Sequence, residues 1–247
     1  MRRAPAWLTD LPFAHRGLHD ADAGVPEHTR AAFEAAIAAG YGIELDVRLS
    51  ADDAVMVFHD EMLDRVTAVS GPLASRDADE LARLSLSGCD ETIPTLEEIL
   101  DLIGGRTPLL VEIKQPGRDV APLASATRRA LAGYDGRYAV QSFNPLTLAW
   151  FRRHAPEVCR GQIATRRSHG DPDQRAGLAA FIASHLLTCF LSRPHFIAYD
   201  ILDLPFWPPR LARGLGWPLL TWTVRTPGQL ALAKSCTDNQ IFEAVRP

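Results

Sequence analysis

The stretch IELDV at residues 43–47 decides the fold and supplies the first candidate site residues. Its apolar and acidic residues alternate with the period of a β-strand, so Glu44 and Asp46 point to one face and the three apolar side chains to the other. Two carboxylates side by side inside a strand repel each other, and a hard divalent cation bound through oxygen atoms would stabilise them. Exposed acids on an edge strand are the alternative.

The stretch LLVEIK at residues 109–114 repeats this arrangement one unit later. Glu112 and Lys114 share a face at the end of an otherwise apolar strand. In a parallel barrel both strand ends open on the same rim, where Glu112 can complete a three-carboxylate metal site with Glu44 and Asp46. Lys114, one of only two lysines, would then face an anionic substrate. A salt bridge from Lys114 to Glu112 or Glu44 is the alternative.

Short strand-like runs alternate with helical runs along the whole chain, which predicts a TIM (β/α)₈ barrel rather than an open doubly wound sheet. A length of 247 residues allows one large domain or two small ones. The alternation favours a single domain over residues 1–247, with a small polar insertion at residues 60–94 after the second strand. We expect strands at 11–15, 42–47, 109–114, 138–141, 158–163, 196–200, 219–224 and 240–243, a short extended piece at 55–59, and helices at 29–39, 96–103, 120–131, 145–154, 174–185, 208–213 and 227–235.

Two of the eight histidines, His15 and His59, each close a strand-like run and precede a polar residue. On a common barrel rim, two imidazoles can serve as general acid and general base near neutral pH. A structural role for each histidine is the alternative.

Arg16 suits bidentate contact with phosphate oxygens, and Gly17 allows close approach of the backbone. Carboxylates, two cations and two histidines together indicate phosphoryl chemistry.

The composition excludes several classes of protein. With 47% hydrophobic and 23% charged residues, the chain is typical of a globular protein. A net charge of -4 gives no basic surface for a nucleic-acid partner. The longest apolar stretch, 178–191, is too short to span a bilayer, and residues 1–10 lack the apolar core of a secretory signal. We therefore expect a cytoplasmic protein without a transmembrane segment, whose oligomeric state the sequence leaves open.

Nine short motifs, taken together, resemble the glycerophosphodiester phosphodiesterase family. They are HRG at 15–17, PEHT at 26–29, ELDV at 44–47, HDE at 59–61, LDR at 63–65, IPTLEE at 93–98, EIK at 112–114, SFN at 142–144 and WTV at 222–224. The chain departs from the family pattern at His28, where the family usually has Asn. It also lacks a Gly-rich segment ending in Thr-Asp near its last strand.

The resemblance implies a TIM barrel that cleaves a small glycerophosphodiester to glycerol 3-phosphate and an alcohol. It implies one divalent cation, Mg²⁺ or Ca²⁺, as cofactor. The roles that it implies are metal ligation by Glu44, Asp46 and Glu112, acid and base catalysis by His15 and His59, and phosphate binding by Arg16 and Lys114.

Two other functions remain open from the sequence. A lysophospholipid substrate would need an apolar groove for an acyl chain, and the stretch LPFWPP at residues 204–209 is a candidate lining. Packing of outer helices is the alternative interpretation of that stretch. A barrel that binds phosphodiesters without turnover is the second possibility.

Overall fold

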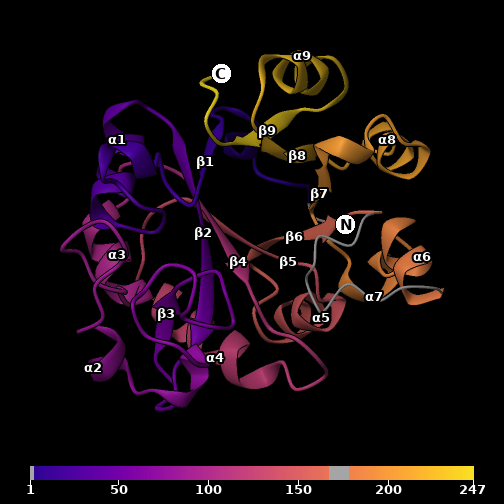
Figure 1. Ribbon diagram of the computed structural model, residues 1–247. Helices are drawn as coiled ribbons and strands as arrows, with labels where there is room; N and C mark the ends of the chain where they lie inside the picture. Colours follow the sequence, from indigo (N-terminus) through magenta and orange to yellow (C-terminus); the bar gives the residue numbers. More distant parts are fainter. Residues whose placement is uncertain (1–2, 167–177) are drawn as a thin grey trace. The chain divides into compact units, whose positions relative to one another are not determined.

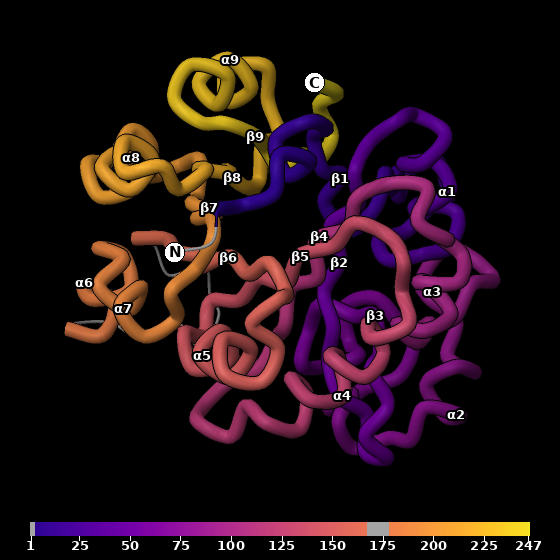
Figure 2. Tube along the Cα trace, turned by 180° about the vertical axis from the view of Figure 1, so that it is seen from behind, coloured from indigo at the N-terminus to yellow at the C-terminus, as the bar shows by residue number. Residues whose placement is uncertain are grey.

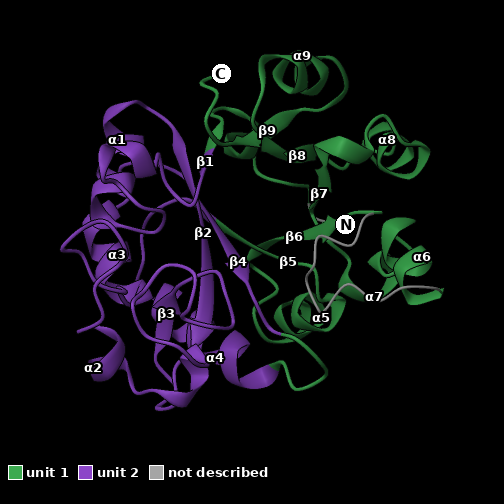
Figure 3. Ribbon diagram, viewed as in Figure 1, with its two compact units in different colours: residues 1–13, 116–120, 139–247 green, residues 14–115, 121–138 purple. Residues whose placement is uncertain are grey.

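The computed structural model describes residues 3–166 and 178–247. The chain divides into two compact units (Figure 3), which are described one at a time. Unit 1 contains residues 1–13, 116–120 and 139–247, and unit 2 contains residues 14–115 and 121–138.

The described strands form a single sheet in the order β1-β9-β8-β7-β6-β5-β4-β2-β3, with β1 also paired to β2 (Figure 1). The pairing of β1 to both β9 and β2 closes eight strands into a ring, and β3 adds to β2 from outside that ring. The predicted TIM barrel is therefore confirmed. The strands are β1 (Phe13–His15), β2 (Gly42–Leu49), β3 (Val55–Val57), β4 (Leu109–Ile113), β5 (Tyr138–Ser142), β6 (Cys159–Ala164), β7 (Phe196–Asp200), β8 (Leu219–Val224) and β9 (Asn239–Phe242).

Two of the helices of unit 2 begin at residues that cap a helix N-terminus, and one of them ends at a glycine that favours a helix C-terminus. Thr29 caps α1 (Arg30–Ala38) by accepting a hydrogen bond from the backbone N–H of Ala32. Thr95 and Glu98 form a capping box at the start of α3 (Leu96–Ile103), which ends at Gly104 in a left-handed conformation. The remaining helices of this unit are α2 (Ala78–Leu81) and α4 (Ala121–Leu131), with short 3₁₀ turns η2 (Ala21–Ala23) and η3 (Leu73–Ser75).

The small insertion after the second strand has an apolar centre of its own. Strand β3 pairs antiparallel with β2, and the chain then runs through η3 and α2 before α3 begins. The buried side chains that gather in this segment are Met56, Phe58, Leu63, Leu73, Leu81, Leu86 and Ile93. The insertion is thus a small packed layer that holds its loops in place.

The register between β2 and β4 sets the position of the acidic residues. The two strands are parallel, and Asp46 lies opposite Glu112 while Glu44 lies opposite Leu110. Because side chains alternate along both strands, Glu44, Asp46 and Glu112 project from the same face. This register is the first observation that brings the predicted carboxylates together.

Unit 1 contains the parallel strands from β5 onward, and its helices lie outside them (Figure 2). The helices are α5 (Pro145–His154), α6 (Leu178–Ser184), α7 (Cys189–Ser192), α8 (Trp207–Gly214) and α9 (Pro227–Cys236), with 3₁₀ turns η1 (Ala6–Thr9) and η4 (Ile201–Asp203). Of the helix predicted at 174–185, residues 174–177 lie outside the described residues. The short helices α2 and α7 and the 3₁₀ turns were not predicted. None of the helices described is long and apolar enough to cross a membrane.

Candidate active site

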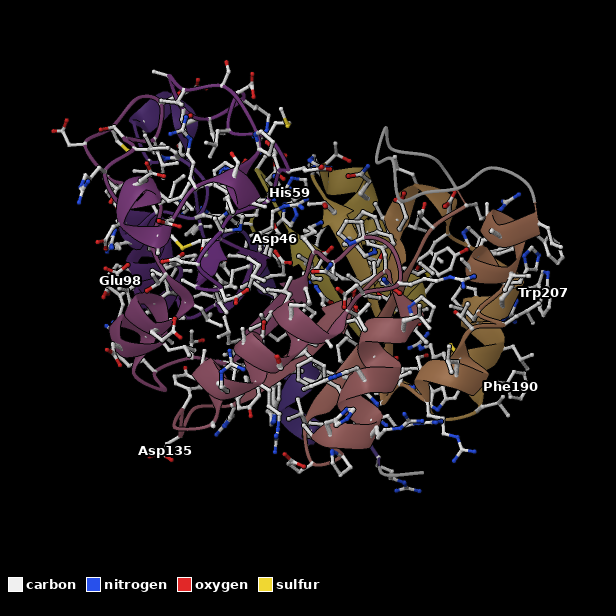
Figure 4. All side chains as sticks on the ribbon, turned by 90° about the horizontal axis from the view of Figure 1, so that it is seen from below. Asp46, His59, Glu98, Asp135, Phe190 and Trp207 are labelled. Atoms are coloured by element: carbon white, nitrogen blue, oxygen red, sulfur yellow. The ribbon has the colours of Figure 1, made fainter. Side chains whose placement is uncertain are left out.

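Three carboxylates of unit 2 converge where the middle of β2 runs beside the end of β4. Glu44, Asp46 and Glu112 are all buried, and one oxygen of each lies within 4.8 Å of the other two. Figure 4 labels Asp46 in this part of the unit, next to His59. The apolar side chains that alternate with these acids, including Leu45 and Val111, are fully buried and hold both strands in the core.

Two cations lie beside the carboxylates. The Arg16 backbone N–H donates to Glu44 Oε2 at 3.2 Å, and the Arg16 Nε lies 3.3 Å from Asp46 Oδ2. Lys114 Nζ lies 2.6 Å from Glu112 Oε1 and 3.3 Å from Asp46 Oδ1. The salt bridge from Lys114 to Glu112 is thus present, and its second partner is Asp46. Three carboxylates facing two cations leave an excess of negative charge.

The pKa values of the three acids respond differently to this crowding. Burial, followed by repulsion from Asp46 and Glu112, raises the pKa of Glu44 well above its usual value. Burial, against attraction from Lys114, also raises the pKa of Glu112. Burial acts to raise the pKa of Asp46 too, but Lys114, His59, His28 and Arg16 together hold it well below its usual value. Asp46 is therefore the acid that keeps its charge most firmly, while burial and repulsion favour the protonated form of the two glutamates.

This donor set fits a divalent cation. Buried carboxylate oxygens from three residues are the ligands that Mg²⁺ and Ca²⁺ prefer, and two positive charges would offset the repulsion that raises the pKa of Glu44 and Glu112. The exposed edge-strand alternative for Glu44 and Asp46 is wrong, because each side chain is only 1% exposed.

The loop after β1 places Arg16 against the acids. His15 ends the strand, and Arg16 follows in a left-handed conformation with φ of 56°. Gly17 also has positive φ, and a Cβ atom there would lie 2.9 Å from the Cβ of Ala32 in α1. The close approach predicted for Gly17 is therefore present, and it lets the loop pass tightly over the helix.

His59 belongs to a chain of charged side chains that returns to Arg16. The His59 Nδ1 lies 2.6 Å from Asp60 Oδ1, and Arg65 contacts Asp60 Oδ2 at 2.5 Å through Nε and Glu27 Oε1 at 2.6 Å through Nη2. Glu27 Oε1 in turn accepts from Arg16 Nη1 at 2.9 Å. These contacts connect a candidate catalytic histidine with a candidate phosphate-binding arginine.

The ionised carboxylate of Asp60 fixes the tautomer of His59. Burial acts to raise the pKa of Asp60, but hydrogen bonds from His59 and Arg65 lower it to about 2. Asp60 is therefore an acceptor only, so the neutral His59 ring carries its proton on Nδ1 and leaves Nε2 for proton transfer. Burial lowers the pKa of His59, with Asp46 and Asp60 opposing this shift in part.

His28, where the family pattern has Asn, is buried beside Asp46. Its Nε2 accepts a hydrogen bond from the backbone N–H of Asp46 at 3.2 Å and lies 3.3 Å from Asp46 Oδ2. His28 therefore makes a polar contact with the strand that carries two of the acids. Its backbone has a φ of 60°, a conformation that Asn adopts more readily than most residues.

Sequence reasoning missed the roles of Glu27, Asp60 and Arg65, although all three occur in the motifs of the resemblance. Glu27 lies more than 30 residues before Asp60 and Arg65, and no periodic pattern connects such distant positions. The available signal was the acid immediately after His59, a common way of orienting an imidazole.

The stretch at residues 204–209 agrees mainly with the packing interpretation. Leu204, Pro208 and Pro209 are buried within unit 1, and the ring of Phe206 lies against Tyr199 with centroids 6.0 Å apart. Within this stretch, Trp207 is the large apolar side chain that stays exposed.

Comparison with known proteins identifies relatives over most of the chain. Residues 15–242 match the model of the glycerophosphoryl diester phosphodiesterase family. A glycerophosphodiester phosphodiesterase of Bacillus altitudinis is 34% identical over 157 residues, which cover 59% of this chain and 63% of that protein. One from Caldanaerobacter subterraneus is 34% identical over 166 residues, covering 63% of this chain and 67% of the relative. These alignments thus span about two thirds of each relative.

Solved structures show the same fold. A phosphodiesterase of Oleispira antarctica, solved with its product sn-glycerol-3-phosphate, superposes with a TM-score of 0.79 at 24% identity and covers 96% of this chain and 94% of that one. A putative glycerophosphoryl diester phosphodiesterase of Silicibacter pomeroyi has a TM-score of 0.75 at 25% identity, covering 93% and 88%.

Proposed function

Because the chain belongs to the glycerophosphoryl diester phosphodiesterase family, we propose that it hydrolyses glycerophosphodiesters to glycerol 3-phosphate and an alcohol. The observation that carries the proposal is the convergence of three buried carboxylates with Arg16 and Lys114 in unit 2. The sn-glycerol-3-phosphate bound by the Oleispira antarctica phosphodiesterase supports the same product here.

We propose that Glu44, Asp46 and Glu112 hold one Mg²⁺ or Ca²⁺ ion. The proximity and burial of their oxygens support this assignment. When bound, the cation would neutralise negative charge on the phosphate oxygens. Binding it would also relieve the repulsion between the two glutamates and Asp46.

The side chains around the acids supply the remaining steps in this proposal. Arg16 and Lys114 bind the phosphate oxygens and orient the diester. One of His15 and His59 removes a proton from the nucleophile and the other gives a proton to the leaving alcohol. If the nucleophile is a neighbouring glycerol hydroxyl rather than water, the first step forms a cyclic phosphodiester, which water then opens to glycerol 3-phosphate with the two histidines exchanging roles. Asp60 keeps the His59 Nδ1 protonated, so Nε2 is the atom that exchanges the proton.

The test measures alcohol release from glycerophosphocholine by the intact protein, with and without EDTA. We expect EDTA to abolish turnover and added Mg²⁺ or Ca²⁺ to restore it, and His15→Ala and His59→Ala each to lower kcat by at least about 100-fold. Undiminished activity in EDTA contradicts the metal role, and full turnover in either variant contradicts the acid and base roles. Tight binding in calorimetry without any product would instead support the barrel that binds without catalysis.

A further inference from the structure

Exposed apolar side chains concentrate in one short part of unit 1. Among the described residues ten large hydrophobic side chains are exposed, and nine of them lie between positions 178 and 215. The tenth, Met62, lies in the insertion of unit 2. The nine, called the apolar face below, are Leu178, Phe181, Leu187, Phe190, Leu191, Leu202, Trp207, Leu211 and Leu215.

Most of the apolar face lies on α6, α7 and α8, with Leu187 between α6 and α7, Leu202 in η4 and Leu215 directly after α8. The three helices lie along the same edge in Figure 1, and in the perpendicular view of Figure 4 the labelled side chains of Phe190 and Trp207 reach outward at that edge. The His185 ring connects α6 to α8, because it stacks on Phe181 at 3.9 Å and lies 5.8 Å from the ring of Trp207. The exposed residues of α6 and α8 therefore form one surface.

Helix α8 is apolar on two sides. Its buried side consists of Pro208, Pro209 and Ala212, which face the rest of the unit. Trp207, Leu211 and Leu215 recur every four residues and form a stripe exposed to solvent, with Trp207 60% exposed. Packing against the unit requires only one apolar side of a helix, so a second apolar side exposed to water indicates a surface that contacts another molecule.

Within residues 178–217 the exposed charged side chains are all arginines. Between residues 178 and 217 they are Arg193, Arg210 and Arg213, whereas both acids of the stretch, Asp200 and Asp203, are buried. Arg213 is neutralised by Asp238 at 2.9 Å. Two further arginines therefore flank the apolar face, and no exposed acid lies among these residues.

The positive charge of the exposed arginines favours an anionic partner. In a symmetric dimer the same patch meets itself, which would bring arginines toward arginines without an acid from this stretch to pair them. An anionic lipid surface offers phosphate groups for the arginines, a headgroup layer for the amphipathic Trp207 ring and hydrocarbon for the leucines and phenylalanines. We propose that the apolar face of α6, α7 and α8 docks this protein onto an anionic lipid bilayer.

The test is co-sedimentation of the intact protein with vesicles, which requires no turnover and is therefore independent of the proposed function. We expect binding to vesicles containing phosphatidylglycerol, weaker binding to pure phosphatidylcholine, and loss of the difference at high salt. Phe190→Ser combined with Trp207→Ser should weaken binding by at least about tenfold, since both side chains lose apolar area to bury. Met62→Ser is the matched control, because it removes an exposed apolar side chain outside the face, and it should bind like the parent.

Arg193→Gln combined with Arg210→Gln should lower binding to anionic vesicles while leaving the weak binding to phosphatidylcholine unchanged. Circular dichroism and hydrolysis of the soluble diester should remain at the parent level in all of these variants. Absence of binding to phosphatidylglycerol vesicles, or equal loss in Met62→Ser, overturns the proposal. A dimer in sedimentation equilibrium that Phe190→Ser with Trp207→Ser dissociates, without vesicle binding by the parent, also overturns it and assigns the face to a contact between copies.

Discussion

Arg65 is the residue whose side chain holds His59 and Arg16 in a common network. It contacts Asp60 and Glu27 at once, so its removal frees both acids from the positions that orient the two site residues. We expect Arg65→Met to lower kcat by about tenfold with little change in KM, an effect typical of residues that orient a catalytic group. Arg65→Lys should recover part of the loss, since it restores the charge without the planar fork.

A matched control is available for Arg65 in the same unit. Arg106 forms a bidentate pair with Glu34 on the exposed surface, at 2.6 and 3.1 Å. Steady-state kinetics of Arg106→Met should match the parent enzyme. A kcat for Arg65→Met equal to that of Arg106→Met would mean that the network does not position His59.

Glu44 should oppose stability when no cation is bound. Burial and neighbouring acids raise its pKa, so ionised Glu44 makes the folded state less favourable at neutral pH. We expect Glu44→Gln to raise the Tm of the EDTA-treated protein. Mg²⁺ at 100 times its Kd should raise the stability of the parent by about 2.7 kcal/mol and its Tm accordingly. Glu44→Gln should lose this response, because it removes one of the proposed ligands. Thermal unfolding followed by circular dichroism measures both. A parental response of Glu44→Gln to Mg²⁺ would remove Glu44 from the ligand set.

At the scale of elements, the turn between β1 and α1 depends on Gly17. Gly17 and Gly40 both have positive φ, 84° and 76°, but only at Gly17 does an added Cβ meet another atom, that of Ala32 at 2.9 Å. We expect Gly40→Ala to cost about 1 kcal/mol from backbone strain and Gly17→Ala about 2 to 4 kcal/mol from strain plus the clash. Urea unfolding compares the two variants, and equal losses would show that α1 moves away without penalty.

Elements with strong local signals were predicted to the residue. Helix α3 begins at a capping box and ends at a left-handed glycine, and α5 begins after Asn144 with a proline at its first position. Both match the predicted bounds, as do β7 and β8. The short turn α7 escaped prediction because four residues give too few positions to establish a helical period.

At the scale of the whole molecule, the acids predict how stability depends on pH. The raised pKa values of Glu44 and Glu112 mean that the folded protein binds their protons more tightly than the unfolded chain, so stability rises as pH falls through those values. The lowered pKa values of Glu27 and Asp60 have the opposite effect on stability. Their contribution is complete above the unfolded values of about 4 and is lost as pH falls toward the folded value, about 2 for Asp60.

We therefore expect the two glutamates to raise the Tm in EDTA as pH is lowered from about 7 to about 5, against the opposite contribution of His59, whose lowered pKa destabilises the folded state below about 6.5, and we expect the Tm to decrease below about 4. Saturating Mg²⁺ should remove the first increase, since the cation replaces the protons on the glutamates, and leave the acid loss in place. Differential scanning calorimetry across this range measures both limbs. The Glu44→Gln variant isolates the contribution of Glu44, because it leaves His59 unchanged: a parent whose change in Tm between pH 7 and 5 equals that of Glu44→Gln would show that Glu44 is not held at a raised pKa.

The sequence by itself determined which strands form and which acids share a face, because the alternation of side chains along a strand is a local property of two or three residues. It also determined the family, through short motifs spread from residue 15 to residue 224. Only the tertiary structure decided that Asp46 lies opposite Glu112, that Arg65 connects Glu27 to Asp60, and that α8 exposes a second apolar side. The Asp46–Glu112 pairing and the Arg65–Glu27 contact join segments far apart in the chain, and their geometry depends on strand register and loop closure. The exposed side of α8 depends on which side of the helix packs against the rest of the unit, which the helical period alone does not decide.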